Sequence, residues 1–235
     1  MLARLKCVQV IRSMSGTIVV AASLLMSSSA PVSSHDDWIF HTIDVLTGNM
    51  KSTLLIGDLA AINTNAFDAR DPRIGDIVAF RHPVSSELWV KRILGVPGDI
   101  VQMRDGRVVL NGLPLAQEPV GTFQEPYEPQ GRLGSYPRCS NAPVGLSETC
   151  KKSMLREVAA SGASYQILKI ANEAPGDNTE KFEVPEGHYF VLGDNRDNSL
   201  DSRWSVSDGG LGMVPRALLR GTVGVLARNP DFMPH

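Results

Sequence analysis

The sequence predicts a mainly β fold, and two observations favour it. The 21 glycines and 15 prolines fall in short clusters between apolar stretches, which is typical of strands joined by turns and not of a helical bundle. Apolar residues alternate with polar ones, or with Gly and Pro, in residues 73–83 (RIGDIVAFRHP) and 88–112, as in half-buried strands and hairpins. With 235 residues, 43% of them hydrophobic, the chain can bury a core in one domain.

The charge of the chain argues against a nucleic-acid partner. The formal net charge is -2 and the isoelectric point is near 6.2. No run of Lys or Arg forms the basic stripe that a phosphate backbone would require. We therefore expect no binding of DNA or RNA.

Residues 1–40 are expected to form an N-terminal signal-anchor segment and linker. Arg4, Lys6 and Arg12 precede an apolar run at 17–26, and small residues follow it, which is the order of an export signal. The run is shorter than the roughly 20 residues that span a bilayer as a helix. Two interpretations remain: an anchor that stays attached, or a signal that is cleaved near residues 28–30. The basic residues place the N-terminus in the cytoplasm and the body of the chain outside.

Two of the three cysteines, Cys139 and Cys150, flank an insert that is rich in Pro, Gly and Ser. Either they form a disulfide, which would stabilise the loop by roughly 3 kcal/mol and require an oxidising compartment, or they are free thiols. Cys7 would stay unpaired. No metal site is expected, because neither a CxxC pair nor a His cluster accompanies the thiols.

The most informative stretch is residues 189–203, YFVLGDNRDNSLDSR, in which Gly, Asp, Asn, Arg and Ser follow directly on an apolar strand. Alternating Asp and Arg can form charge-paired hydrogen bonds. Asn, Asp and Ser side chains can bond nearby backbone and fix a turn. The stretch predicts a rigid loop that holds a side chain in place.

GDNRDNSLDSR resembles the last signature box of type I signal peptidases, the membrane-bound Ser-Lys proteases that cut signal peptides from exported proteins. GDIVAF at 75–80 and VKRILGVPGD at 90–99 resemble the two middle boxes, in the expected order and spacing. The resemblance implies a coiled antiparallel β-sheet catalytic core with a smaller β subdomain. It places the catalytic domain at 41–235, with 112–184 as an inserted variable β subdomain. Ser-Lys chemistry requires no metal or organic cofactor.

Lys91 matches the general-base lysine of the family. By position alone, a Lys in an apolar strand usually faces outward, but in an apolar pocket its pKa would fall until it accepts a proton near neutral pH. Ser199 matches the residue that hydrogen-bonds this amine, although by itself a hydroxyl there would more often stabilise a turn. Arg92 is expected on the opposite strand face, paired with an acid. The residues expected to support the loop are Asp194, Arg196, Asp197, Asp201 and Arg203.

The nucleophile box departs from the family pattern. Residues 46–58 (LTGNMKSTLLIGD) fit it in position, but Asn49 holds the slot of the nucleophilic serine. Thr47 matches the hydroxyl that donates to the oxyanion. A carboxamide has no proton whose removal gives a useful attacking group, so cleavage would need Ser52 as an alternative nucleophile, or a water activated by Lys91. The expected substrate groove consists of Met50, Leu54, Trp89 and Val90.

Two functions remain open. One is a signal peptidase I-like membrane-associated serine endopeptidase that removes signal peptides from exported preproteins, which the intact Lys91 and Ser199 favour. The other is a catalytically inactive homologue that binds signal peptides or membrane partners, which Asn49 favours. The expected partners are signal peptides and membrane lipid, and we expect a monomer.

The expected location is the bacterial cytoplasmic (inner) membrane, with a single pass and the catalytic domain on the outer (periplasmic) face. Little helix is expected, and residues 151–160 (KKSMLREVAA) are the best short candidate.

Overall fold

The computed structural model describes residues 40–159 and 161–230. The chain divides into two units, residues 1–37 and residues 38–235, and all described residues belong to the second unit. The expected signal-anchor segment therefore lies outside the described residues, apart from its last position. Within the described ranges, none of the helices has both the length and the apolar character needed to cross a bilayer.

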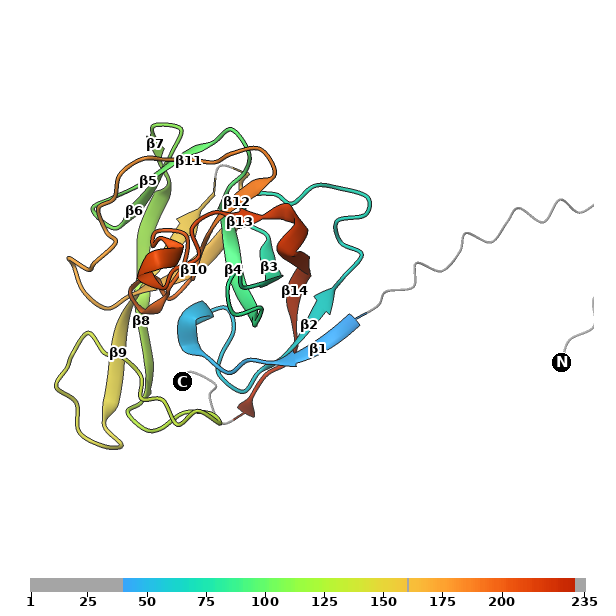
Figure 1. Ribbon diagram of the computed structural model, residues 1–235. Coiled ribbons are helices and arrows are strands. Elements are labelled where there is room, and N and C mark those ends of the chain that lie inside the picture. The colour runs from blue at the N-terminus through green and yellow to red at the C-terminus, as the bar shows by residue number, and fades with distance from the viewer. Residues whose placement is uncertain (1–39, 160, 231–235) are drawn as a thin grey trace, which may run out of the picture. The chain divides into compact units, whose positions relative to one another are not determined.

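The described part of the chain consists of strands and short 3-10 helices (Figure 1). The strands are β1 (Phe40–Asp44), β2 (Leu59–Asn63), β3 (Ile77–Arg81), β4 (Leu88–Gly95), β5 (Ile100–Arg104), β6 (Arg107–Leu110), β7 (Leu113–Pro114), β8 (Ala116–Pro126), β9 (Thr149–Val158), β10 (Ser164–Lys169), β11 (Phe182–Glu183), β12 (His188–Leu192), β13 (Val214–Pro215) and β14 (Leu219–Ala227). The 3-10 helices are η1 (Gly48–Met50), η2 (Arg196–Asn198), η3 (Val206–Asp208) and η4 (Arg216–Leu218). The prediction of a mainly β fold is confirmed.

Three sheets form this domain, and the strand pairs within them are antiparallel, as predicted. A seven-stranded sheet has the order β1-β2-β14-β3-β4-β12-β13, a three-stranded sheet the order β10-β9-β8, and a four-stranded sheet the order β11-β5-β6-β7. The last strand, β14, therefore lies between β2 and β3 of the large sheet. The sheet brings together strands from the two ends of the described chain.

The large sheet carries apolar side chains on both faces. Successive side chains of a strand point to opposite faces, and in β12 Tyr189 and Val191 belong to one apolar cluster while Phe190 and Leu192 belong to another. All four side chains are buried. The apolar run before the polar loop at 193–203 is thus fixed on both sides, and the loop starts from a rigid strand.

The prediction of a short helix at residues 151–160 is wrong, because β9 occupies most of this stretch. The strand pairs with β8 on one side and with β10 on the other. Its burial alternates, since Lys152 is buried between exposed Lys151 and Ser153. Pairing along both edges outweighs the modest helix propensity of these residues.

The stretch expected as a variable subdomain, 112–184, contains β7 to β11. Its three-stranded sheet lies wholly inside this range, whereas the four-stranded sheet also takes β5 and β6 from the preceding residues.

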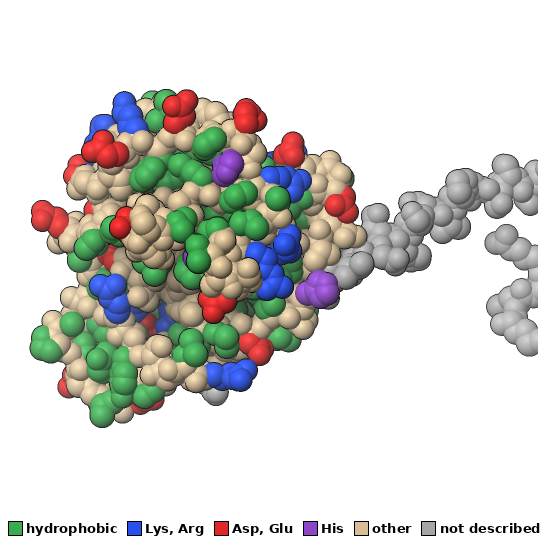
Figure 2. Space-filling model, in the orientation of Figure 1, with side chains coloured by type: hydrophobic (Ala, Val, Ile, Leu, Met, Phe, Trp, Pro, Cys, Tyr) green, Lys and Arg blue, Asp and Glu red, His purple; other side chains and the backbone are tan. Residues whose placement is uncertain are grey.

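The β8–β9 connection carries exposed hydrophobic side chains, among them Leu133, Tyr136 and Leu146. On the face shown in Figure 2, Lys and Arg side chains lie in small separate groups between other side chains.

Candidate active site

The loop that carries Asn49 connects β1 to β2 and is fixed at both ends. The Val45 N–H donates to the carbonyl of Asp58 at 2.9 Å, and the Gly57 N–H donates to the carbonyl of Val45 at 2.8 Å. Between these ends, Met50 and Leu54 are each 1% exposed and pack into an apolar cluster with residues of β2, β3 and β14. Backbone hydrogen bonds and apolar packing therefore hold η1 in place.

Asn49 is held by the loop that follows β12. The Asn195 backbone N–H donates to the carbonyl of Asn49 at 3.0 Å, and the Asn195 Nδ2 donates to the carbonyl of Gly48 at 2.8 Å. The Asn49 Nδ2 itself donates to Thr47 Oγ1 at 2.8 Å. The side chain in the nucleophile slot is thus a hydrogen-bond donor, bonded to the hydroxyl expected at the oxyanion position.

Gly193 is the point of closest approach between the two loops. A Cβ atom added there would lie 2.3 Å from Ser199 Oγ and 2.6 Å from the carbonyl oxygen of Asn49. Real Cβ atoms essentially never come this close to other heavy atoms. Gly193 and Asn195 were not singled out in the sequence, although both belong to the quoted motif, where a Gly directly after a buried strand is a signal of close backbone approach.

Lys91 lies in the middle of β4 and is 0% exposed. Its Nζ has no hydrogen-bond partner among the described residues, and it lies 5.4 Å from the centre of the Trp89 ring. Burial lowers the pKa of Lys91 from 10.5 to about 8; Asp201 and Asp194 oppose this shift, and Arg203 reinforces it. The amine is therefore neutral in a large fraction of molecules at mildly alkaline pH.

Asp201 braces the loop after β12, and its charge acts against the lowering of the Lys91 pKa. Its carboxylate accepts from the Gly193 N–H at 3.2 Å and from Arg203 in a bidentate pair, with 2.8 Å for each bond. Burial tends to raise the pKa of Asp201, but the Arg203 guanidinium lowers it below its usual range. The carboxylate stays ionised and balanced by Arg203, so that Lys91 lacks a dedicated counter-ion.

Arg92 points away from Lys91 and pairs with an acid, as predicted. Its Nε and Nη2 donate to the two carboxylate oxygens of Asp194 at 2.9 and 2.7 Å. Its guanidinium lies over the Tyr165 ring at 4.0 Å. The hydroxyl of Thr53 also donates to Asp194, which ties the Asn49 loop to this buried pair.

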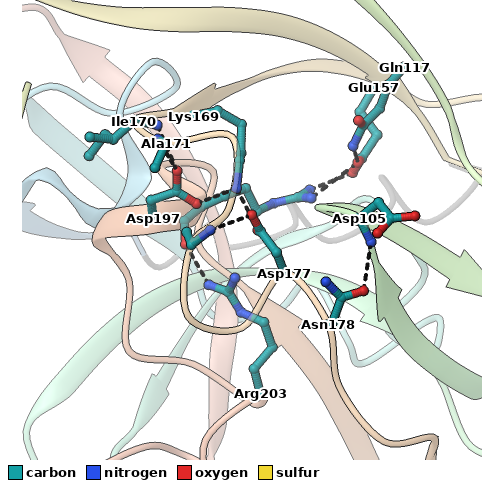
Figure 3. Close-up of polar contacts among 12 residues, drawn as sticks. Asp105, Gln117, Glu157, Lys169, Ile170, Ala171, Asp177, Asn178, Asp197 and Arg203 are labelled. Carbon is teal, nitrogen blue, oxygen red and sulfur yellow. Dashed lines mark hydrogen bonds and ion pairs between the residues drawn. The ribbon is translucent and has the colours of Figure 1, made fainter. Parts of the chain in front are cut away.

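Arg196 and Asp197 join the polar loop to the three-stranded sheet; Figure 3 shows Asp197 beside Lys169 and Ile170. Asp197 accepts from the Lys169 Nζ at 2.6 Å and from the Ile170 N–H at 2.7 Å. The buried Arg196 makes two hydrogen bonds to the buried Glu157. The five residues expected to support the loop, Asp194, Arg196, Asp197, Asp201 and Arg203, thus all take part in ion pairs.

The hydroxyl groups of Ser199 and Ser52, two further candidate site residues, contact backbone carbonyls. Ser199 is half-buried and its Oγ donates to the carbonyl of Leu200 at 3.4 Å, so the expected hydrogen bond to the Lys91 amine does not form here. The Ser52 Oγ lies 3.5 Å from the carbonyl of Gln166 in β10. Both contacts are long for a hydroxyl donor, which prefers about 2.7 to 2.8 Å.

Of the expected groove residues, Trp89 and Val90 are half-buried. Met50 and Leu54 lie almost wholly inside the core and support the loop from beneath. Among the described residues, no group of three or more His, Cys, Asp and Glu side chains has the geometry of a metal site. Cys139 in the β8–β9 connection forms a disulfide with Cys150 of β9, with the two Cα atoms 5.1 Å apart.

Known proteins resemble this chain over most of its length. A protein-family model described as signal peptidase, peptidase S26, matches residues 16–227. Signal peptidase I of Pseudomonas aeruginosa is 31% identical over 196 residues, which cover 76% of this chain and 61% of that relative. Signal peptidase I of Rickettsia prowazekii is 32% identical over 204 residues, which cover 75% and 67% of the two chains.

A crystal structure of a signal peptidase I from Enterococcus faecalis aligns with a TM-score of 0.34 and 26% identity, over 65% of this chain and 97% of that one. The alignment with the Pseudomonas enzyme leaves about two fifths of that relative unmatched. Because the family model matches far more than half of the residues, this chain belongs to the signal peptidase S26 family.

Proposed function

We propose that this chain binds the C-terminal part of signal peptides of exported preproteins, at the site formed by Asn49, Lys91 and the loop after β12. The observation that carries this proposal is the buried Lys91 amine without a hydrogen-bond partner, held beside a loop that two other segments brace. An unpaired buried amine is unfavourable in the absence of a ligand or a reaction that uses it. An extended peptide would lie beside the sheet edge with small side chains against Trp89 and Val90.

Cleavage of the bound peptide is the first candidate activity. As a serine endopeptidase of the signal peptidase I type, the chain would use Lys91 as the general base. Thr47 would donate to the oxyanion. The attacking group would have to come from Ser52 or from a water activated by Lys91, since the carboxamide of Asn49 cannot supply it.

Binding without cleavage is the second candidate, and Asn49 favours it. Its carboxamide supplies no useful attacking group, and its Nδ2 donates to Thr47 Oγ1. Such a homologue would retain signal peptides or membrane partners and leave their cleavage to another enzyme. The bracing of the loop would serve binding equally well.

Membership of the family supports a membrane location. We propose a monomer in the bacterial cytoplasmic membrane, with a single N-terminal pass and the described domain on the periplasmic face. Leu46 and Leu200, which are 40% and 50% exposed, flank Thr47 and Ser199. These apolar side chains would let the site contact lipid where the signal peptide emerges.

Cleavage and binding of one model preprotein in detergent test the proposal. The unaltered chain, Asn49→Ser and Lys91→Ala are compared. If the unaltered chain binds without cutting and Asn49→Ser cuts, the non-catalytic candidate holds. If the unaltered chain cuts and Lys91→Ala does not, the endopeptidase candidate holds and Ser52→Ala is the next variant. If neither the unaltered chain nor Asn49→Ser binds the preprotein, the proposed function is refuted.

A further inference from the structure

A second buried polar cluster lies beneath the candidate active-site loop, and it carries an excess positive charge. Lys51 and Lys152 both form ion pairs with the same carboxylate, that of Glu125. The two lysines are 3% and 1% exposed, and Glu125 is 7% exposed. Gln130 is neutral and donates to Glu125 at 2.8 Å. Two buried ammonium groups therefore share a single negative charge.

Each ammonium group also has an unused donor. An ammonium carries three N–H groups. Lys51 donates to Glu125 and, at 2.6 Å, to Gln130. Lys152 donates to Glu125 and contacts the Cys150 sulfur at 3.7 Å. In the described part of the chain, one N–H group on each lysine is left without an acceptor.

A pocket of about 40 Å³ opens beside these donors. It is lined by Lys51, Lys152 and Arg138, by Glu125, and by Gly48 and other neutral residues, both polar and apolar. Arg138 is exposed, and its Nη1 donates to the carbonyl of Asp197 at 2.7 Å. A cavity needs roughly 10–15 Å³ to hold a water molecule, so this one has room for about three non-hydrogen atoms. That volume fits a halide or a carboxylate group.

We propose that this pocket binds one compact monoanion, a halide or a carboxylate, between Lys51, Lys152 and Arg138. A buried excess charge is stabilised by an opposite charge within hydrogen-bond reach. Both oxygens of Glu125 already accept from the lysines, so its charge is fully engaged. Burial, opposed by Glu125 and reinforced by Lys152, lowers the pKa of Lys51, and a second anion would counteract this shift.

The site borders the candidate active site. A Cβ atom added to Gly48 would lie 3.2 Å from the Lys51 Cε, so the lysine stem runs directly under η1. The occupied pocket would hold this stem in place and thereby support the loop that carries Asn49. The inference does not rest on the proposed function, because it concerns binding of an ion and not of a preprotein.

Thermal unfolding of the full chain in detergent tests the proposal. Sodium methanesulfonate, whose anion is too bulky for the pocket, is replaced by sodium chloride or sodium formate at constant ionic strength. A bound anion raises Tm in a saturable way. We expect this rise for the unaltered chain and for Lys151→Met, the matched variant at an exposed lysine of the same strand. We expect it to vanish in Lys152→Met, which removes the excess charge.

Glu125→Gln should strengthen anion binding, whereas Lys152→Met should weaken it. Without the carboxylate, two ammonium groups face the pocket, and the apparent Kd for chloride should fall by tenfold or more. Crystals of the unaltered chain grown in sodium bromide should show an anomalous peak between the two lysines. This test does not depend on whether any variant folds. The proposal is overturned if Tm does not depend on the identity of the anion and bromide leaves the pocket empty, or if Lys152→Met keeps the full chloride response.

The same donors could take a free ion or a carboxylate of a bound peptide. A peptide with one Asp and its Asn analogue are titrated in chloride-free buffer. A preference for the Asp peptide that is lost in Lys152→Met assigns the carboxylate to the peptide. Equal binding of both peptides, together with the chloride response, assigns the site to a free ion.

Discussion

Replacing Lys91 by Met should stabilise the protein and remove any Lys91-dependent activity. The folded protein holds the pKa of Lys91 at about 8, against 10.5 for an unburied lysine. One pKa unit corresponds to about 1.36 kcal/mol. At pH 7 nearly every molecule is protonated in both states, so the buried charge costs about 3 kcal/mol. Met has a similar volume and no charge, and it should recover most of this free energy.

The pH dependence of the free energy of unfolding shows whether the stability gained by Lys91→Met comes from the loss of a buried charge. Between pH 8 and 10.5 the unfolded state binds more protons at this position than the folded state, so the unaltered chain gains stability as the pH rises. The advantage of Lys91→Met should therefore fall from about 3 kcal/mol at pH 7 to about 2 kcal/mol at pH 9. Denaturant unfolding of the full chain in detergent measures this difference, with the exposed Lys151→Met as the control.

A different outcome would refute the reasoning. If Lys91→Met leaves the free energy of unfolding unchanged at pH 7, the amine is not buried as a poorly solvated cation. If the gain is the same at pH 7 and pH 9, it comes from packing and not from the ionisation of Lys91.

Three further predictions concern the site. Cleavage by Asn49→Ser should exceed that of the unaltered chain by about 10⁴ to 10⁶, and should rise about tenfold between pH 7 and pH 9, as expected for a base with a pKa of about 8. Asp194→Asn leaves buried Arg92 without its ion partner and should lower the free energy of unfolding by about 3–5 kcal/mol in denaturant titrations. Gly193→Ala should destabilise the protein by about 1–3 kcal/mol, since its Cβ would collide with two loops, whereas Gly224→Ala, with no atom within 4 Å, should have little effect.

Each of these predictions has a result that contradicts it. A hundredfold rise of cleavage between pH 7 and 9 would indicate an ordinary lysine pKa, and no cleavage at all would show that the missing hydroxyl is not the only defect. Asp71→Asn, at an acid whose side chain is 91% exposed, is the control for Asp194→Asn, and equal effects of the two would argue against a buried ion pair. Equal effects of the two glycine variants would argue against close contact at Gly193.

Local patterns in the sequence were enough to predict β3, β4 and the polar loop that follows β12. Alternating apolar residues indicated β3 and β4, and their pairing places Val78 opposite Lys91. The alternation of faces along β4 predicted an acid partner for Arg92, and Asp194 is that partner. These predictions succeed because they depend on neighbours within a few positions along the chain.

Features that depend on distant residues were not predictable. A Lys in an apolar strand usually faces solvent, and only the packing of other strands buries Lys91 completely. The expected helix at 151–160 is a strand because β8 and β10 pair with it. The cluster of Lys51 and Glu125 joins residues 74 positions apart, and nothing in either local sequence points to the other.

The position of β14 determines the order in which parts of the domain can fold during synthesis. β2, which follows the Asn49 loop, is bonded within the described chain to β1 and to β14, but not to β3. At the end of the same loop, Asp58 accepts hydrogen bonds from Arg228 and from the Asn229 N–H. These residues are synthesised after β3, β4 and β12. In a nascent chain the strands around Lys91 are therefore synthesised first, but the Asp58 end of the loop that carries Asn49 gains these bonds only after β14 has been made.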